Sequence, residues 1–195
     1  MDKLFYFSKS ANKKAGKGVN EHVKNENEYK ELNKITDWRK MLSNFYISPF
    51  VLDNKKWASV EHYYHSQKFK SNPKFSETFE YDSDSSYSKD AGKAKSAGGK
   101  SGKGRDYKYK NVAMDKDFYS NTDKIFKISM FSKFTQNPEL MKVLLATGNA
   151  ELLHGTRGTP IQRVYSLEKV KDCIRKFKDR IDLSKVRIIN NKLIL

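Results

Sequence analysis

The chain has 195 residues, enough for one domain with its own core, and its 13% aromatic content argues against disorder despite a mean hydropathy of -0.83. Its single cysteine, Cys173, excludes an internal disulfide, and the sequence contains no apolar run of the ~20 residues that a membrane span needs. The 39 basic and 23 acidic residues give a net charge of +16, which favours anionic partners such as nucleic acid or phosphorylated metabolites.

Residues 1–18 lack the hydrophobic core of a signal peptide, so we expect a cytoplasmic or nuclear protein. Most of the positive charge is lysine and is spread along the chain. A lysine-rich composition without a specific anionic partner is therefore the alternative explanation for the net charge.

Polar residues dominate positions 9–36, which predict a loop with a short helix around residues 26–35. The chain then becomes apolar. Residues 49–60, PFVLDNKKWASV, are typical of a β-hairpin whose turn lies at Asp53 and Asn54.

A helix is predicted to follow, with Ser59 as its N-cap and with Tyr64 and Lys68 on its buried face. Residues 71–90 are acidic and Ser-rich, whereas residues 91–110 are basic and Gly-rich. We interpret this contrast as a surface excursion within one domain, because neither side of it carries enough apolar residues for a core of its own.

The C-terminal part predicts further helices. One covers residues 123–136, another begins with Pro138 at its first position and ends before Gly148, and a last amphipathic helix is capped by Ser166. Strand-like residues follow at 186–195, with Asn190 and Asn191 as a turn. The apolar stripe of the last helix consists of Leu167, Val170, Ile174, Phe177 and Ile181.

These elements together predict a mainly α fold, α+β in class, with a minor β-hairpin component. We expect a single domain over residues 1–195, in which residues 176–195 form a basic helix end and the strand-like tail.

The most specific pattern in the chain is residues 42–69, LSNFYISPFVLDNKKWASVEHYYHSQKF. It resembles the NADAR (YbiA-like) family, in which a Leu-Ser-Asn-Phe segment precedes a hairpin with Trp and then Val-Glu-His-Tyr-Tyr. Further similar stretches lie at residues 5–10, 133–158 and 163–170. They follow the family's order, so the resemblance covers most of residues 5–175.

This resemblance implies a predominantly helical fold and an association with NAD and ADP-ribose metabolism. It also implies an N-glycosidase that cleaves the bond at C1 of a phosphorylated ribose. Similar members act on ribosylaminopyrimidine phosphates of riboflavin synthesis, and others on ADP-ribose attached to guanine in DNA.

The functional carboxylate of the family corresponds to Glu61, the acidic residue of the Val-Glu-His motif. N-glycoside cleavage passes through an oxocarbenium-like state, which a carboxylate can stabilise, and a carboxylate can also activate the attacking water. In the first turn of a helix, the dipole favours an ionised side chain, which suits a base better than an acid. An ordinary first-turn glutamate is the alternative.

Three nearby residues are candidates for substrate binding. Asn44 can hydrogen-bond to a ribose or base edge, and Phe45 can stack on a base, although a turn Asn beside a core Phe would look the same. His65 stands four residues after Glu61, where it could orient the carboxylate.

Two basic stretches are candidates for phosphate binding. Gly-rich residues 92–105 could cradle an anion, and the family resemblance makes Lys95 and Arg105 phosphate contacts. In the turn HGTRG, we expect His154 and Arg157 at the substrate, with Arg157 able to bind phosphate through two hydrogen bonds. Many bacterial members carry a Trp-Gly segment here that this sequence lacks, so the substrate could differ from the riboflavin intermediates.

We expect no cofactor and no metal, because the His62, His65 and His154 set lacks a recognised zinc signature. Two alternatives to catalysis remain: a module that binds ADP-ribose or NAD without turnover, and a nucleic-acid-binding protein. Basic clusters at residues 89–110 and 169–187, and the YKYK run at 107–110, favour the second. The sequence leaves the oligomeric state open.

Overall fold

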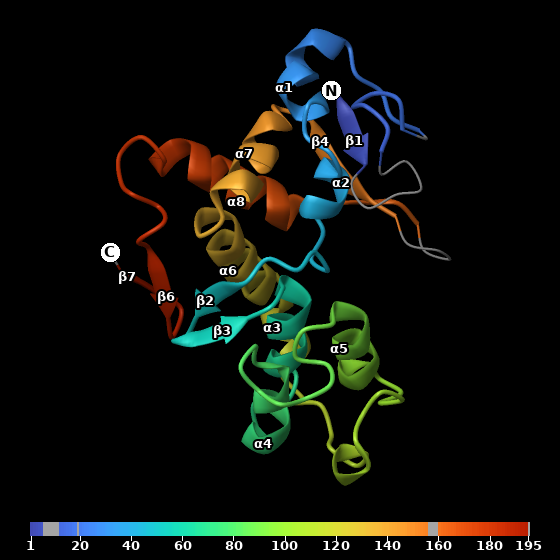
Figure 1. The fold of residues 1–195 in the computed structure, drawn as a ribbon, viewed down its shortest axis with the longest axis vertical. Coiled ribbons are helices and arrows are strands. Elements are labelled where there is room, and N and C mark those ends of the chain that lie inside the picture. The colour runs from blue at the N-terminus through green and yellow to red at the C-terminus, as the bar shows by residue number, and fades with distance from the viewer. Residues whose placement is uncertain (6–11, 19, 156–159, 195) are drawn as a thin grey trace. The chain divides into compact units, whose positions relative to one another are not determined.

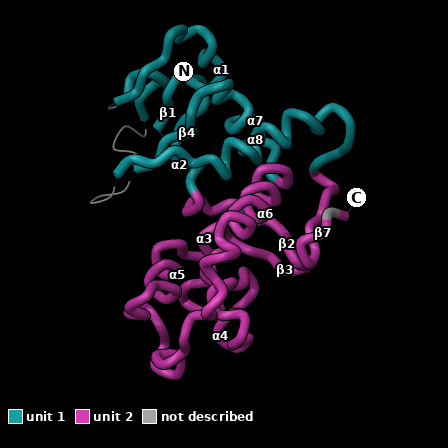
Figure 2. The backbone as a smooth tube through the Cα atoms, turned by 180° about the vertical axis from the view of Figure 1, so that it is seen from behind, with its two compact units in different colours: residues 1–43, 137–183 teal, residues 44–136, 184–195 magenta. Residues whose placement is uncertain are grey.

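The computed structural model describes residues 1–5, 12–18, 20–155 and 160–194, which divide into two units (Figures 1 and 2). The first unit comprises residues 1–43 and 137–183, and the second comprises residues 44–136 and 184–195. Each unit is therefore assembled from two separate stretches of chain. The expectation of a single domain stays a prediction.

A small sheet and short helices make up the first unit. Its elements are β1 (Lys3–Phe5), the 3-10 helix η1 (Glu26–Tyr29), α1 (Lys30–Asn33), α2 (Trp38–Met41), α7 (Pro138–Ala146), β4 (Glu151–His154), β5 (Gln162–Arg163) and α8 (Tyr165–Phe177). β1 pairs in parallel with β4, and β4 pairs antiparallel with β5. α8 packs against both β4 and α7 (Figure 1). The core residues buried between these elements include Leu4, Leu32, Trp38, Leu144, Leu152, Leu167 and Ile174.

Local signals bound α7 correctly but misplace the start of α8, and α2 was not predicted. Pro138 begins α7, and Gly148 follows its end with a left-handed φ of 54°. The predicted cap at Ser166 is wrong, because the helix starts at Tyr165 and its N-cap is Val164, two residues before the predicted one. The reason is that Val164 still donates its N–H to Leu152 of β4, so the helix begins directly where the strand pairing stops.

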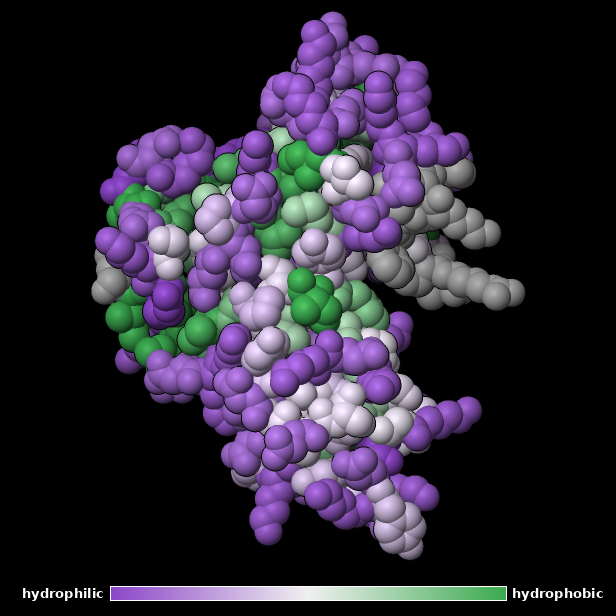
Figure 3. Space-filling view, viewed as in Figure 1, coloured by the Kyte–Doolittle hydropathy of each residue, from purple (hydrophilic) through white to green (hydrophobic). Residues whose placement is uncertain are grey.

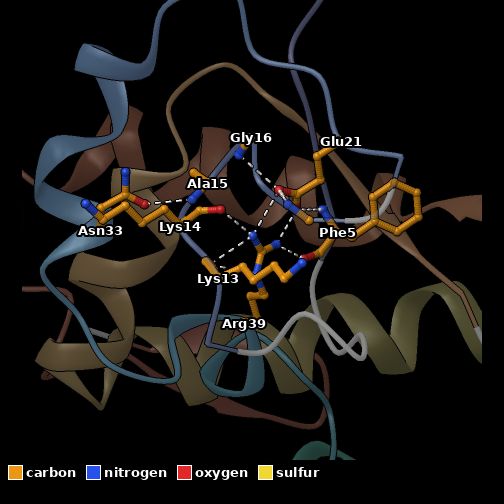
Figure 4. Close-up of polar contacts among 9 residues, drawn as sticks. Phe5, Lys13, Lys14, Ala15, Gly16, Glu21, Asn33 and Arg39 are labelled. Carbon is orange, nitrogen blue, oxygen red and sulfur yellow. Dashed lines mark hydrogen bonds and ion pairs between the residues drawn. The ribbon is translucent and has the colours of Figure 1, made fainter.

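A buried ion pair fixes the loops of the first unit (Figure 4). The Arg39 guanidinium is fully buried, pairs with the Glu21 carboxylate and donates to backbone carbonyls. Glu21 in turn accepts hydrogen bonds from backbone N–H groups. The carbonyls belong to Phe5, Lys13 and Lys14, and the N–H groups to Phe5, Gly16 and Gly18. Loop backbone that lacks regular structure thus satisfies its polar groups through two side chains.

Helix α3 (Val60–Gln67) lies at the centre of the second unit and packs against α4, α5 and α6. The other elements are β2 (Phe50–Leu52), β3 (Lys55–Trp57), α4 (Pro73–Ser76), η2 (Glu77–Phe79), α5 (Ala91–Gly98), η3 (Tyr107–Tyr109), η4 (Phe118–Asn121), α6 (Thr122–Thr135), β6 (Arg187–Ile189) and β7 (Lys192–Ile194).

Both predicted hairpins are confirmed. β2 and β3 pair antiparallel through Asp53 and Asn54, whose φ angles are 55° and 59°. β6 and β7 pair likewise through Asn190 and Asn191. Asx residues tolerate this left-handed conformation, which two-residue hairpin turns require.

The Gly-rich stretch is more ordered than the sequence suggests. Residues 91–98 form α5, and the Asp90 side chain caps it by accepting the N–H of Lys93 at 2.9 Å. Ala91, Ala94 and Ala97 recur every third residue and are buried. Small side chains at this spacing let α5 approach α3 closely, which the glycine content of the sequence obscures.

The fold class, mainly α with small β-hairpins, is confirmed. Hydrophilic side chains cover much of the visible surface of the second unit (Figure 3). Within the described residues, we find no helix that combines the length and the apolar character of a membrane-crossing segment.

Candidate functional site

Glu61 lies in the first turn of α3 and is 8% exposed. Its backbone N–H donates to the carbonyl of Asn44 at 3.1 Å, which satisfies one of the free amides at the start of the helix. Ser59 occupies the N-cap position, but its hydroxyl bonds to Nδ1 of His62 at 2.8 Å and makes no cap hydrogen bond. The predicted cap is therefore correct in position and wrong in contact.

His65 holds the Glu61 carboxylate. Its Nε2 lies 2.9 Å from Oε1 of Glu61, one helical turn away, and both side chains are nearly inaccessible. Burial lowers the pKa of His65, and the hydrogen bond to Glu61 opposes that shift. Since an ionised carboxylate can only accept a hydrogen bond, Nε2 carries the proton that orients it.

Gly98 permits this arrangement, because α5 approaches the His65 ring at that residue. A Cβ built on Gly98 would lie 2.1 Å from Nδ1 and 2.4 Å from Cγ of His65. Both residues are buried. The missing side chain at position 98 therefore sets where His65, and through it the Glu61 carboxylate, can lie.

We expect Gly98→Ala to destabilise the protein by about 1–3 kcal/mol, because the new methyl group must displace a buried ring. It should also lower activity by moving His65 away from Glu61. Urea unfolding and kinetics measure the two effects. Gly92→Ala in the first turn of α5 is the matched control, since its Cβ meets only Asp90 Oδ1 at 3.3 Å. Equal stability and activity of the two variants would contradict the role given to Gly98.

Lys68 follows α3 and belongs to the same cluster. It is 9% exposed, its Nζ donates to the carbonyl of Gly98 at 3.3 Å, and its ammonium lies 4.7 Å from the centre of the Tyr64 ring. Burial lowers the pKa of Lys68, while the Glu61 carboxylate raises it. The sequence placed Lys68 on the buried face of the helix without assigning it a role. Its position seven residues, or two turns, after Glu61 could have indicated that the two side chains lie on the same face.

The structure also brings Phe45 and Lys95 together in this unit. The Lys95 ammonium, on α5, lies 5.3 Å from the centre of the half-buried Phe45 ring. Asn44 contributes its backbone carbonyl to Glu61, as described above. The structure thus places these sequence candidates around α3.

Arg105 is engaged by the protein itself. Its Nε donates to the carbonyl of Ala97 at 2.8 Å, and its Nη1 donates to the carbonyl of Val112 at 2.6 Å. The guanidinium also lies 4.9 Å from the centre of the Phe69 ring. These contacts join the end of α5 to the following loop, so Arg105 holds this loop in place.

The last two candidates are His154 and Arg157. His154 ends β4 in the first unit and is half-buried. Arg157 lies outside the described residues.

The family model of the NADAR domain matches residues 25–162 of this chain. This chain belongs to the NADAR domain family. The recognition made from residues 42–69 is therefore confirmed, and Glu61, His65, Lys68 and Gly98 all lie within the matched range.

One curated relative and one solved structure are similar to this NADAR chain. It is 28% identical over 114 residues to the N-glycosidase YbiA of Shigella boydii serotype 4, covering 58% of this chain and 61% of that relative. The chain thus spans less than two thirds of the length of that relative. It also resembles the NMR structure of Escherichia coli YbiA, with a TM-score of 0.57 and 23% identity, over 73% of this chain and 82% of the other. The second likeness supports the fold alone.

Lys133 on α6 is a buried ionisable residue of this NADAR chain that the sequence did not single out. It is 1% exposed, and burial lowers its pKa to about 7. Its ammonium lies 5.6 Å from the centre of the Tyr46 ring.

In the described part of the chain, no group of three or more His, Cys, Asp or Glu residues could hold a metal ion.

We expect the stability of this NADAR protein to fall as the pH falls below about 6.5. Burial lowers the pKa of His62 to about 4; Glu61 and Asp90 oppose this shift, and His65 reinforces it. As the pH falls, His62 is protonated in the unfolded chain before it is protonated in the folded protein. The contribution of neutral His62 to the free energy of unfolding is therefore complete above pH 6.5 and falls by about 3 kcal/mol as the pH approaches 4. Urea unfolding across this range measures the slope, which His62→Gln should flatten. An equally steep slope in that variant would show that other groups cause it.

Proposed function

We propose that this protein is an N-glycosidase that hydrolyses the bond between a nitrogen atom and C1 of a phosphorylated ribosyl group. The observation that carries the proposal is the buried Glu61 carboxylate, held by His65 at the start of α3. The name of the Shigella relative, an N-glycosidase, supports the same reaction class.

In the proposed reaction, the bond between C1 and the nitrogen breaks and its electron pair leaves with the nitrogen. Glu61 stabilises the positive charge that develops at C1 and accepts a proton from the attacking water. The water oxygen bonds to C1, the leaving nitrogen takes up a proton from solvent, and Glu61 returns to solvent the proton that it accepted. His65, whose pKa burial lowers, donates its Nε2–H to the carboxylate and fixes its position.

A chromatographic screen tests this proposal. Purified protein is offered an ADP-ribosylated oligonucleotide, NAD, ADP-ribose and ribosylaminopyrimidine phosphates, and released base and sugar are quantified. We expect release from at least one substrate by wild-type protein. Binding of these compounds without release by wild-type protein would instead identify a module that holds ADP-ribose or NAD.

We propose that the protein also binds nucleic acid, which would carry the base from which the ribosyl group is removed. Tyr107 is 84% exposed, and the ammonium of Lys110 lies 4.8 Å from the centre of its ring. An exposed ring beside lysines suits base stacking combined with phosphate attraction. Fluorescence anisotropy with single- and double-stranded DNA should show affinity that falls by about 0.7–0.9 log units per log unit of salt for each phosphate neutralised. Absence of binding at micromolar protein would leave metabolites as the substrates.

A further inference from the structure

A cavity of about 310 Å³ opens in the second unit, between the end of α3, the end of α5 and residues 110–114. The backbone holds these segments together, since Asp115 donates its N–H to the carbonyl of Lys68 at 2.8 Å. The volume is in the range of small-ligand sites. Its polar lining includes Lys68, Lys100, Ser101, Arg105, Lys110 and Asn111.

The charge of this cavity is of one sign. Among the described residues that line it, basic side chains occur and no Asp or Glu does. Two of the basic residues have a structural role at the carboxyl end of α5, where Lys68 and Arg105 donate to the carbonyls of Gly98 and Ala97. Lys100 and Lys110 do not bind these carbonyls, and they add positive charge on the loops that line the cavity.

Helix geometry connects this cavity to the Glu61 carboxylate. Glu61 and Lys68 are seven residues apart, so they lie on the same face of α3, about 10 Å apart along the axis. The Lys68 side chain is longer than that of Glu61 and leans towards the helix N-terminus. Burial lowers the pKa of Lys68 and the Glu61 carboxylate raises it, so the two charges interact. Lys68 thus lines the cavity and also interacts electrostatically with the carboxylate that we place at the reacting carbon, although Glu61 itself does not line the cavity.

We propose that this cavity binds the phosphate or diphosphate group of the substrate. Lys100 and Lys110 would contact it, together with the two N–H groups of Lys68 that do not bond to the Gly98 carbonyl, while Asn111 and Ser101 supply neutral donors. This inference rests on the proposed function for the identity of the ligand. It changes the assignment made from sequence, because Arg105 is largely occupied by backbone carbonyls. The phosphate contacts then come from lysines on both sides of it.

Isothermal titration calorimetry with inorganic pyrophosphate and ribose 5-phosphate tests the site without requiring turnover. Lys100→Ala and Lys110→Ala should each weaken binding about tenfold, as expected for one charge-assisted contact. Both residues are exposed, so the fold should tolerate these changes. Lys103→Ala is the matched control: it lies in the same loop, is exposed and does not line the cavity.

The outcomes separate this inference from the proposed function. Binding that is lost in Lys100→Ala and Lys110→Ala and kept in Lys103→Ala supports the site, even if no substrate in the screen is cleaved. Turnover with unchanged KM and unchanged pyrophosphate binding in both variants overturns the site while leaving the glycosidase intact. Equal weakening in all three variants also overturns it, because only overall charge would then matter.

Discussion

Glu61→Gln should lower kcat by about 10²–10⁴-fold, the range found when a positioned acid or base is removed. The substitution keeps the size of the side chain and an oxygen that can accept from His65, so the fold and KM should change little. What disappears is the negative charge opposite C1 and the proton acceptor for water. Steady-state kinetics on the substrate found in the screen measures the effect.

Glu77→Gln is the matched control for that experiment. Glu77 lies on η2, which packs against α3, but its side chain is 58% exposed and faces Lys55 at 4.0 Å. The same chemical change there should leave kcat unaltered. Activity of Glu61→Gln within a few-fold of wild type would remove Glu61 from the chemical step.

Arg39→Met should destabilise the protein by about 3–5 kcal/mol, because it leaves the Glu21 carboxylate buried without its counter-charge. The backbone carbonyls that Arg39 satisfies would lose their donor at the same time. Urea unfolding, or the thermal midpoint, measures the loss. Arg39→Met combined with Glu21→Gln should be less destabilising than the sum of the two single changes, since removing both charges avoids the unpaired one.

An exposed pair provides the comparison. Lys34 and Glu31 form an ion pair whose side chains are 69% and 66% exposed. Lys34→Met should change stability by less than about 1 kcal/mol, as surface pairs generally do. Equal effects of Arg39→Met and Lys34→Met would show that the buried pair contributes no more than the exposed one.

The features that the sequence predicted well are those encoded within a few residues. Paired Asx residues define both hairpin turns, and Pro138 and Gly148 bound α7. The contact between Glu61 and His65 is likewise local, since residues four apart in a helix face each other. In each case, the contacts that define the feature are made between residues close together in the sequence.

The features that the sequence missed depend on distant partners. Three residues of β1 carry too little pattern to predict a strand, and they form one because β4 is beside them. Arg39 and Glu21 look like surface residues of a polar loop until both are buried together. Arg105 looked free to bind phosphate, because its carbonyl partners lie in segments whose course the sequence does not reveal.

The parallel pairing of β1 with β4 has a consequence for the order in which the chain acquires its structure. β1 precedes β4 in the chain, and the whole of residues 44–136 is synthesised between them. That intervening stretch holds nearly all of the second unit and can begin to fold while synthesis continues. Contacts between ends so far apart form slowly. β1 therefore acquires its pairing partner late, and until then Leu4 and Phe5 stay exposed to solvent or to a chaperone.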